Sequence, residues 1–233
     1  EYIPNAGYNN SGVSLNNEFF FSTKSDFLPG AKINVAADYI RDSYKLFASQ
    51  TPTFLRETNG GSAIFSIASS YNRWVNFGLD LRGNILSLSE NGLKETNFAS
   101  NGLFEFKQSN FTVGAKGYYS KQILEKNLSG IDGYNFYSTE GYVKVFLTNV
   151  LNFTLGINYA SNSSSSFFAP FGSIEYKLDK GLTLSAEFNP HAKFFSVTDF
   201  IKRNIYFNFG VTDNVFLEYN TDINGMIRYE YEK

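Results

Sequence analysis

Strict alternation of apolar and polar side chains is the feature that most limits what this chain can fold into. It is clearest in the segment 148–159, T-N-V-L-N-F-T-L-G-I-N-Y. Apolar side chains occupy every second position there, at Leu151, Phe153, Leu155, Ile157 and Tyr159. Because alternate side chains of a strand point to opposite faces of a sheet, one face of this strand is apolar and the other is polar. The segment 142–147 alternates in the same way across a short turn, so the two segments predict an antiparallel hairpin.

The same hairpin pattern recurs along the whole chain. Short turn signals occur at 25–30, 71–73, 108–110, 148–149, 179–181 and 212–214. The alternating runs predict strands at 13–24, 31–41, 62–71, 74–86, 97–107, 110–120, 138–148, 150–160, 168–178, 181–189, 204–212 and 214–221, with a further strand at 225–232. Longer polar connections are predicted at 42–61, 87–97, 120–135, 160–166 and 189–203. Short turns at one rim and long loops at the other are typical of membrane barrels.

These features predict an all-β fold, a single antiparallel up-and-down transmembrane β-barrel of about 12 to 14 strands. The barrel is expected to form one domain over residues 1–233, with a short irregular or helical loop at about 190–203. Most predicted strands reach the roughly 9 to 11 residues that a spanning strand needs, whereas strands of soluble proteins cluster near five or six. A soluble β-sandwich is the alternative, because its strands alternate in the same way.

The alternation also predicts which side chains face water and which face lipid. Charges in the middle of strands are tolerated beside water but not in hydrocarbon. The residues predicted to line the lumen, basic and acidic in equal number, are Lys32, Asp38, Asp80, Arg82, Glu105, Lys107, Lys116, Lys144, Glu175, Lys177, Glu187, Glu218, Arg228 and Glu230. The residues predicted to face lipid are Ile33, Val35, Val75, Phe77, Leu79, Leu81, Phe111, Val113, Leu151, Phe153, Leu155, Ile157, Leu182, Leu184, Val215 and Leu217. Alternatively, the charges pair across neighbouring strands and fill a narrow barrel.

The composition excludes several classes of function. The chain of 233 residues has no cysteine, one histidine and a net charge of -2. The absence of cysteine excludes a disulfide framework and a thiolate site, and no cofactor or transition-metal site is expected. The small net charge gives no reason to expect a nucleic-acid partner. No apolar run approaches the roughly 18 residues of a spanning helix, and the opening E-Y-I-P-N is not a signal peptide, so a mature or trimmed chain is expected.

The residues that could carry enzyme chemistry are few. His191 lies near Ser196 and Asp199 in the sequence, but their spacing defines no catalytic geometry. The chain is therefore predicted not to be an enzyme, and His191 is predicted to be a surface-loop residue. Oxygen ligands for calcium are offered by Asp213, Asp222 and Asn224, although such residues usually only form turns.

The repeated pattern resembles outer-membrane β-barrel proteins of Gram-negative bacteria over nearly the whole chain. The segment N-P-H-A-K-F-F-S-V-T-D-F-I-K-R-N, followed by I-Y-F-N-F-G-V-T-D-N-V-F-L-E-Y, resembles TonB-dependent-receptor-like and porin-like barrels. The pattern departs from that of full receptors, because the strands predicted within residues 1–233 are too few and no plug domain is expected before them within this range. Its final R-Y-E-Y-E-K also lacks the terminal aromatic residue that such barrels commonly have. A smaller barrel with an atypical end and a piece of a longer polypeptide are both compatible with this.

The resemblance implies an outer-membrane channel that passes small polar solutes with weak ion selectivity, or the barrel component of a larger transport or assembly complex. The expected partners are the lipid bilayer with its lipopolysaccharide, small polar solutes, and proteins that bind the long loops. Aromatic side chains near strand ends fit the girdles found at membrane interfaces, with candidates Tyr39, Trp74, Phe111, Tyr119 and Tyr159. Two alternatives stay open: a non-transporting structural or interaction barrel, and a soluble β-sandwich binding module.

Overall fold

The computed structural model describes residues 8–24, 28–45, 55–69, 74–89, 92–125, 133–162, 165–178, 181–203 and 217–229. These residues form one 11-stranded sheet and one helix. The strands are β1 (Tyr8–Phe20), β2 (Lys32–Lys45), β3 (Leu55–Ser69), β4 (Val75–Leu88), β5 (Lys94–Lys107), β6 (Phe111–Glu125), β7 (Gly133–Phe146), β8 (Leu151–Asn162), β9 (Ser166–Leu178), β10 (Leu182–Phe194) and β11 (Leu217–Tyr229). The helix α1 (Val197–Arg203) lies between β10 and β11 in the chain.

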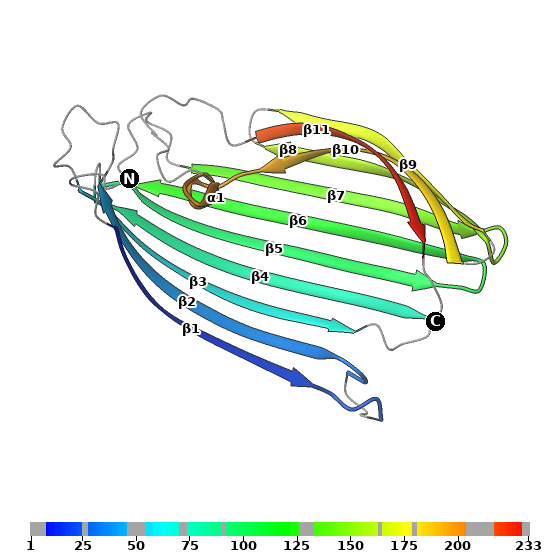
Figure 1. Cartoon of the computed structure of the whole chain (residues 1–233), viewed down its shortest axis with the longest axis horizontal. Coiled ribbons are helices and arrows are strands. Elements are labelled where there is room, and N and C mark those ends of the chain that lie inside the picture. The colour runs from blue at the N-terminus through cyan, green and yellow to red at the C-terminus, as the bar shows by residue number, and fades with distance from the viewer. Residues whose placement is uncertain are drawn as a thin grey trace.

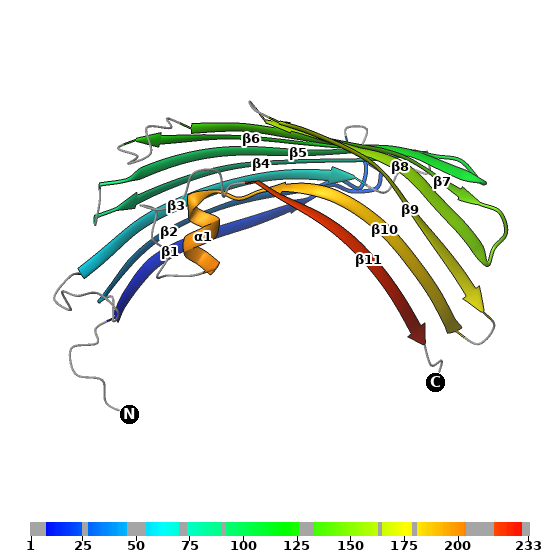
Figure 2. The same cartoon turned by 90° about the horizontal axis from the view of Figure 1, so that it is seen from above.

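The strands follow one another around the sheet in the order of the sequence. Each strand pairs antiparallel with the next, from β1 at one edge to β11 at the other (Figure 1). Figure 2 shows that the sheet is strongly curved and that α1 lies in its hollow. The predicted all-β, antiparallel up-and-down arrangement is therefore confirmed, and the first ten predicted strands each correspond to one observed strand.

The β7–β8 hairpin shows how local chemistry sets this arrangement. The backbone N–H groups of Leu147 and Thr148 donate to the carbonyl of Leu151, which closes the turn. The Thr148 Oγ1 atom accepts from the N–H groups of Val150 and Leu151 at 3.2 and 3.1 Å. The hydroxyl thus satisfies turn donors that have no strand partner, a common role of threonine in turns. The register that follows places Val143 opposite Leu155, so the apolar residues of both strands share one face.

The end of the chain differs from the sequence prediction. The predicted strands 214–221 and 225–232 overlap a single strand, β11, in which Asp222 and Asn224 lie opposite Asn189 and Glu187 of β10. Asp222 and Asn224 are of types that usually form turns, yet they lie inside a strand. Their side chains are accommodated there because they share a face with the polar side chains of Asn189 and Glu187. The predicted strand 204–212 and Asp213 lie outside the described residues. The described strands number 11, fewer than the 12 to 14 expected.

The connections that were predicted to be long are shorter because the strands continue into them. The residues left between strands are 46–54, 89–93, 126–132 and 163–165, where the sequence predicted 42–61, 87–97, 120–135 and 160–166. Polar residues in these extensions interrupt the apolar alternation, so the sequence pattern predicted connections there. In the β5–β6 ladder, for example, Asn97 lies opposite Gln122 and both side chains are buried.

The segment 190–203 is part strand and part helix. The predicted short helix is confirmed as α1, but the residues before it belong to β10, which continues to Phe194. Only Leu182–Phe188 of β10 pair with β9, so among the described strands that side of β10 is an edge from Asn189 onward. An edge tolerates Pro190, which has no backbone N–H to donate. His191 is therefore a strand residue opposite Asn220, and the prediction of a surface loop is wrong at this position.

A cluster of buried apolar side chains lies beneath α1, on one side of the described sheet. Val197 and Ile201 of the helix pack against a group of buried leucines, Leu86, Leu88, Leu93 and Leu124. All described strands belong to one sheet, so no second sheet covers its apolar rows within the described residues. The described residues thus form a single curved layer with one helix on its inner side.

Candidate functional site on the concave face

The side of the sheet that carries α1 is called the concave face here. The helix packs on Leu86 of β4 and Leu124 of β6, and its backbone bonds to Glu95 of β5. Side chains alternate along each strand, and the register is continuous from ladder to ladder. These contacts therefore fix which residues of the neighbouring strands share the concave face, and the remaining residues lie on the outward face.

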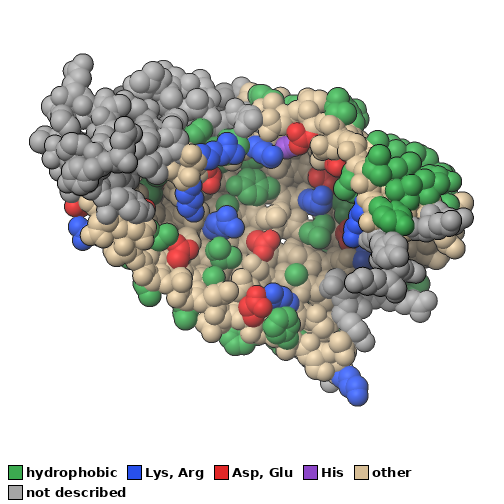
Figure 3. Space-filling model, in the orientation of Figure 1, with side chains coloured by type: hydrophobic (Ala, Val, Ile, Leu, Met, Phe, Trp, Pro, Cys, Tyr) green, Lys and Arg blue, Asp and Glu red, His purple; other side chains and the backbone are tan. Residues whose placement is uncertain are grey.

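The charged residues predicted to line a lumen occupy the concave face by this register. They are Lys32, Asp38, Asp80, Arg82, Glu105, Lys107, Lys116, Lys144, Glu175, Lys177, Glu187 and Arg228. Glu218 lies opposite Lys193 in the β10–β11 ladder, with its side chain outside the described set, and Glu230 lies outside the described residues. Figure 3 shows blue and red side chains spread across the hollowed face.

The sequence predicts that six of these charges face the lumen near mid-height, but the structure does not place them at one level: Arg82, Glu105, Lys116, Lys144, Glu175 and Glu187. Lys116 lies inside β6, opposite Glu140 of β7. By contrast, Glu105, Lys144 and Glu175 lie close to the strand ends at the short turns. The strands extend further than predicted at the rim near α1, which moves their midpoints away from these three residues.

The outward face carries the residues predicted to face lipid. They are Ile33, Val35, Val75, Phe77, Leu79, Leu81, Phe111, Val113, Leu151, Phe153, Leu155, Ile157, Leu182 and Leu184. Val215 and the side chain of Leu217 lie outside the described set. Five glycines, Gly83, Gly102, Gly117, Gly141 and Gly225, would place an added Cβ in space with no atom within 4 Å. Among the described elements, nothing packs on this face.

Charged groups of the concave face pair across neighbouring strands. Lys116 Nζ lies 2.7 Å from Glu140 Oε1 across the β6–β7 ladder. The carboxylate of Glu105 accepts from Asn76 Nδ2 at 2.7 Å and from the Tyr142 hydroxyl at 2.5 Å. Neighbouring charges of opposite sign largely cancel in the space above the sheet, so this surface has no strong field of one sign.

The N-terminus of α1 is held by one buried carboxylate. Glu95 on β5 has only 1 % of its surface exposed. Its Oε1 accepts from the N–H of Val197 at 2.8 Å, and its Oε2 accepts from the N–H and Oγ1 of Thr198 at 2.8 and 2.6 Å. Gln122 on β6 donates a further hydrogen bond to Glu95. A carboxylate is favoured here because the free N–H groups of a helix start carry partial positive charge.

The start of α1 is also capped by its own residues. The N–H and Oγ of Ser196 donate to Asp199 Oδ2 at 2.9 and 2.8 Å, and the N–H of Asp199 donates back to Ser196 Oγ at 3.1 Å. This is a capping box, in which a serine and an acidic residue three positions later satisfy each other's backbone donors. The S-V-T-D sequence at 196–199 carries this signal, which the sequence prediction did not use. Glu95, in contrast, fell in a predicted polar connection.

Apolar contacts fix the segment that leads into α1. The ring of Phe194 stacks on that of Phe136 of β7, with centroids 5.8 Å apart and an interplanar angle of 16°. Val197 and Phe136 each have 1 % of their surface exposed. Polar anchoring at Glu95 and apolar packing around Phe136 therefore act together to keep 194–203 in the hollow.

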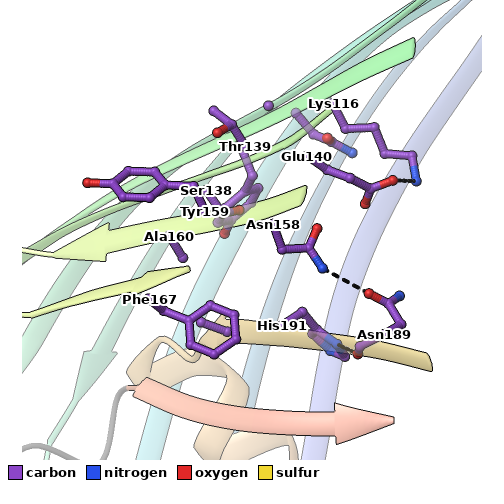
Figure 4. Close-up of a pocket in the computed structure, with 14 residues that line it drawn as sticks. Lys116, Ser138, Thr139, Glu140, Asn158, Tyr159, Ala160, Phe167, Asn189 and His191 are labelled. Atoms are coloured by element: carbon purple, nitrogen blue, oxygen red, sulfur yellow. Dashed lines mark hydrogen bonds and ion pairs between the residues drawn. The ribbon is translucent and has the colours of Figure 1, made fainter. Parts of the chain in front are cut away.

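A cavity of about 250 Å³ opens on the concave face beside β10. Its lining includes Lys116, Glu140, Asn158 and Phe167, which come from four different strands (Figure 4). Asn158 Nδ2 donates to the carbonyl of Pro190 at 2.7 Å, which joins the wall to the edge segment of β10. The cavity offers paired charges, amide groups and an aromatic ring to a small polar molecule.

The only histidine of the chain borders this cavity. His191 Nδ1 lies 3.0 Å from the carbonyl oxygen of Asn189 and 3.7 Å from Asp222 Oδ2. Ser196 and Asp199 are the serine and the acidic residue that lie near His191 in the sequence, and they hydrogen-bond to each other at the start of α1. The hydroxyl proton of Ser196 is therefore donated to Asp199 and not to His191.

Two glycines of the concave face lie beneath aromatic rings. A Cβ at Gly114 would meet the ring of Tyr142, the residue opposite it in the β6–β7 ladder. A Cβ at Gly156 would meet the ring of Phe171, the residue opposite it in the β8–β9 ladder. Glycine at these positions lets a ring lie flat over a neighbouring strand, which extends the sheet's inner surface without filling the hollow.

Comparisons with known proteins do not assign the chain to a family. No family model matches it, and a search of curated proteins gives no match. Among the described residues, no three His, Cys, Asp or Glu side chains form a group suited to a metal ion. None of the helices in the described ranges combines the length and the apolar character needed to cross a membrane.

Proposed function

We propose that this chain forms the wall of a β-barrel in the outer membrane of a Gram-negative bacterium, through which small polar solutes pass with weak ion selectivity. The observation that carries the proposal is the division of a one-layer sheet into an apolar outward face and a charged concave face. The chain would act either alone or as the barrel component of a larger transport or assembly complex. Its partners would be the lipid bilayer with its lipopolysaccharide and the solutes that pass.

The outward face supports contact with lipid. It exposes aliphatic and aromatic side chains in adjacent strands, among them Leu155 at 69 % and Phe168 at 66 % exposure. Exposed apolar area of this extent on a soluble monomer is rare, whereas in lipid it needs no cover. Strand lengths fit as well: the shortest of the described strands, β8, has 12 residues, more than the roughly 9 to 11 needed to span a bilayer.

Aromatic residues on the outward face fit an interface girdle. Tyr119 and Tyr137 lie opposite each other in the β6–β7 ladder, and the rings of Tyr137 and Tyr159 are 6.0 Å apart. Trp74, just before β4, and Phe111, at the start of β6, lie at the other end of the strands and are exposed. Aromatic rings in two groups along the strands suit the two interfaces of a membrane.

The concave face supports contact with water. It carries charges of both signs along the strands, and such charges are excluded from hydrocarbon. The pairing of Lys116 with Glu140 and the bonding of Glu105 to neutral donors leave no strong field of one sign. Weak ion selectivity follows from that balance. Helix α1 and its anchor at Glu95 would narrow the passage near one rim.

A non-transporting barrel is the second candidate, and the inward segment is the observation that favours it. Phe194 and α1 fill part of the hollow with well-packed apolar side chains. If the enclosed space is small, these groups would block it, and the chain would serve as a structural barrel or as a site for partner proteins.

Reconstitution tests both candidates. The purified chain is expected to require detergent, to insert into liposomes, and to give discrete current steps in planar bilayers. Insertion without any current above leak would leave the non-transporting barrel. A chain that stays monodisperse without detergent and does not insert would contradict the membrane proposal altogether.

A further inference from the structure

The two edges of the described sheet are open. Among the described strands, β1 pairs only with β2, and β11 pairs only with β10. Their outward apolar side chains are correspondingly exposed, with Val13 at 71 %, Ile223 at 77 % and Ile227 at 76 %, against 43 % for Val113 of the inner strand β6. In a membrane every backbone N–H and C=O must be paired, so neither edge can face lipid. Each edge therefore needs a neighbouring strand.

The number of strands determines in which direction a strand that pairs with β1 or β11 must run. The strands run alternately up and down, so the first and the last of an odd number run in the same direction. Direct pairing of β1 with β11 would create one parallel ladder in a sheet whose other ladders are all antiparallel. Single-chain bacterial barrels have an even number of strands, which avoids such a ladder.

We infer that β1 does not pair with β11, and that the free edge of β1 binds an extended spanning strand that runs antiparallel to it and comes from polypeptide outside residues 1–233. This inference rests on the proposed membrane location. A second copy of the chain does not suit this edge. All copies insert into the membrane in the same orientation, so a second copy can offer only its own β1 or β11 as an edge strand. Both of these strands run in the same direction as the first copy's β1, so they would pair with it in parallel. An odd number of strands beyond the described 11 is needed to complete the wall.

The register of β1 specifies the chemistry of its partner. Val13 and Leu15 lie on the outward face, and Ser14 and Glu18 lie on the concave face. The partner strand must therefore alternate in the same way, with apolar residues toward lipid and polar residues toward water. Residues 204–216 lie outside the described set, and attachment to them is one of the outcomes that the experiment below distinguishes.

Photo-cross-linking in the native membrane tests this inference. The chain has no cysteine, so Ser11→Cys and Phe19→Cys each give one attachment site for benzophenone-maleimide, near the two ends of β1. Both positions are on the outward face, opposite Arg41 and Ile33 of β2. Cross-links to those parts of β2 serve as an internal control for reach, and mass spectrometry identifies the other products.

The order of attachment decides the outcome. We expect both probes to reach one extended segment outside residues 1–233, with the Ser11 probe attached nearer its C-terminus and the Phe19 probe nearer its N-terminus. Attachment in the opposite order, attachment to β11 of the same or another copy, attachment to 204–216, or products on β2 alone would overturn the inference. A chain that conducts ions while cross-linked between β1 and β11 would overturn it and leave the proposed function intact.

Discussion

Glu95 on β5 accepts both polar donors of Thr198 on α1, the backbone N–H at 2.8 Å and Oγ1 at 2.6 Å. The two residues are 103 positions apart in the sequence, so this contact ties the start of the helix to one end of β5, a strand inside the sheet. The carboxylate is buried, and buried groups that lose their partners are strongly destabilising. The polar part of the anchoring of α1 therefore comes from a single side chain, beside the apolar packing of Val197 and Ile201.

Replacement of that side chain is expected to release α1. Glu95→Ala removes the carboxylate that accepts hydrogen bonds from the N–H groups of Val197 and Thr198. It also leaves the side-chain amide of Gln122 without its carboxylate partner. We expect the free energy of unfolding to fall by roughly 2 to 3 kcal/mol, as for other hydrogen bonds to buried charged groups. Urea unfolding of the reconstituted protein measures this change. If α1 narrows the passage, single-channel conductance rises as well.

A matched control separates the anchor from a general effect of charge removal. Glu125 lies at the end of β6 and is exposed. Glu125→Ala is expected to change the stability by less than about 0.5 kcal/mol, as is usual for surface positions. Equal losses in both variants would contradict the anchoring role of Glu95.

The glycine beneath Phe171 is expected to be intolerant of even a methyl group. A Cβ at Gly156 would meet the Phe171 ring and lie 2.5 Å from the carbonyl oxygen of Gly141, which belongs to the backbone and cannot move aside. Gly156→Ala should therefore lower the free energy of unfolding by about 1 to 3 kcal/mol, as overpacking does elsewhere. Gly141→Ala is the control, because a Cβ there meets nothing within 4 Å. A loss of stability in Gly141→Ala as large as in Gly156→Ala would show that the ring contact is not the cause.

Strand order and face assignment were accessible from the sequence because alternation is a local property. Each strand shows its apolar side within a few residues, as Leu151 to Ile157 do in β8. The β7–β8 turn was accessible for the same reason. The strand ends near α1 were not accessible from the sequence. Polar residues such as Asn97 and Gln122 are typical of connections between strands, but here they are buried and pair with each other in the β5–β6 ladder.

The anchoring of α1 was not accessible, because it depends on contacts between distant segments. Nothing near Glu95 in the sequence indicates that residues 102 and 103 positions later bind it. The capping box of Ser196 and Asp199 is local and could have placed the helix start. Whether the sheet closes depends on the neighbours of β1 and β11, which no alternation pattern within a strand specifies.

The pairing of Lys116 and Glu140 predicts how ion preference responds to charge removal. Lys116→Gln leaves the Glu140 carboxylate without the ammonium that lies 2.7 Å away. A single charge beside water acts on a passing ion with about 0.7 kcal/mol at 6 Å, which corresponds to roughly a threefold change in local ion concentration. We expect Lys116→Gln to favour cations and Glu140→Gln to favour anions. Reversal potentials in a salt gradient measure both shifts, and shifts of the same sign would contradict a lumen position for the pair.

The two faces of β8 provide the sharpest test of the membrane location. Leu155 lies on the outward face and Thr154 on the concave face, although they are neighbours in the same strand. In lipid, Leu155→Arg is expected to lower folding stability in liposomes by roughly 2 to 4 kcal/mol, as arginine does near the bilayer midplane. Thr154→Arg places the same charge beside water and should change stability by less than about 1 kcal/mol. On a soluble sheet with both faces in water the two variants would behave alike, so equal stabilities in liposomes would rule out contact of the outward face with hydrocarbon.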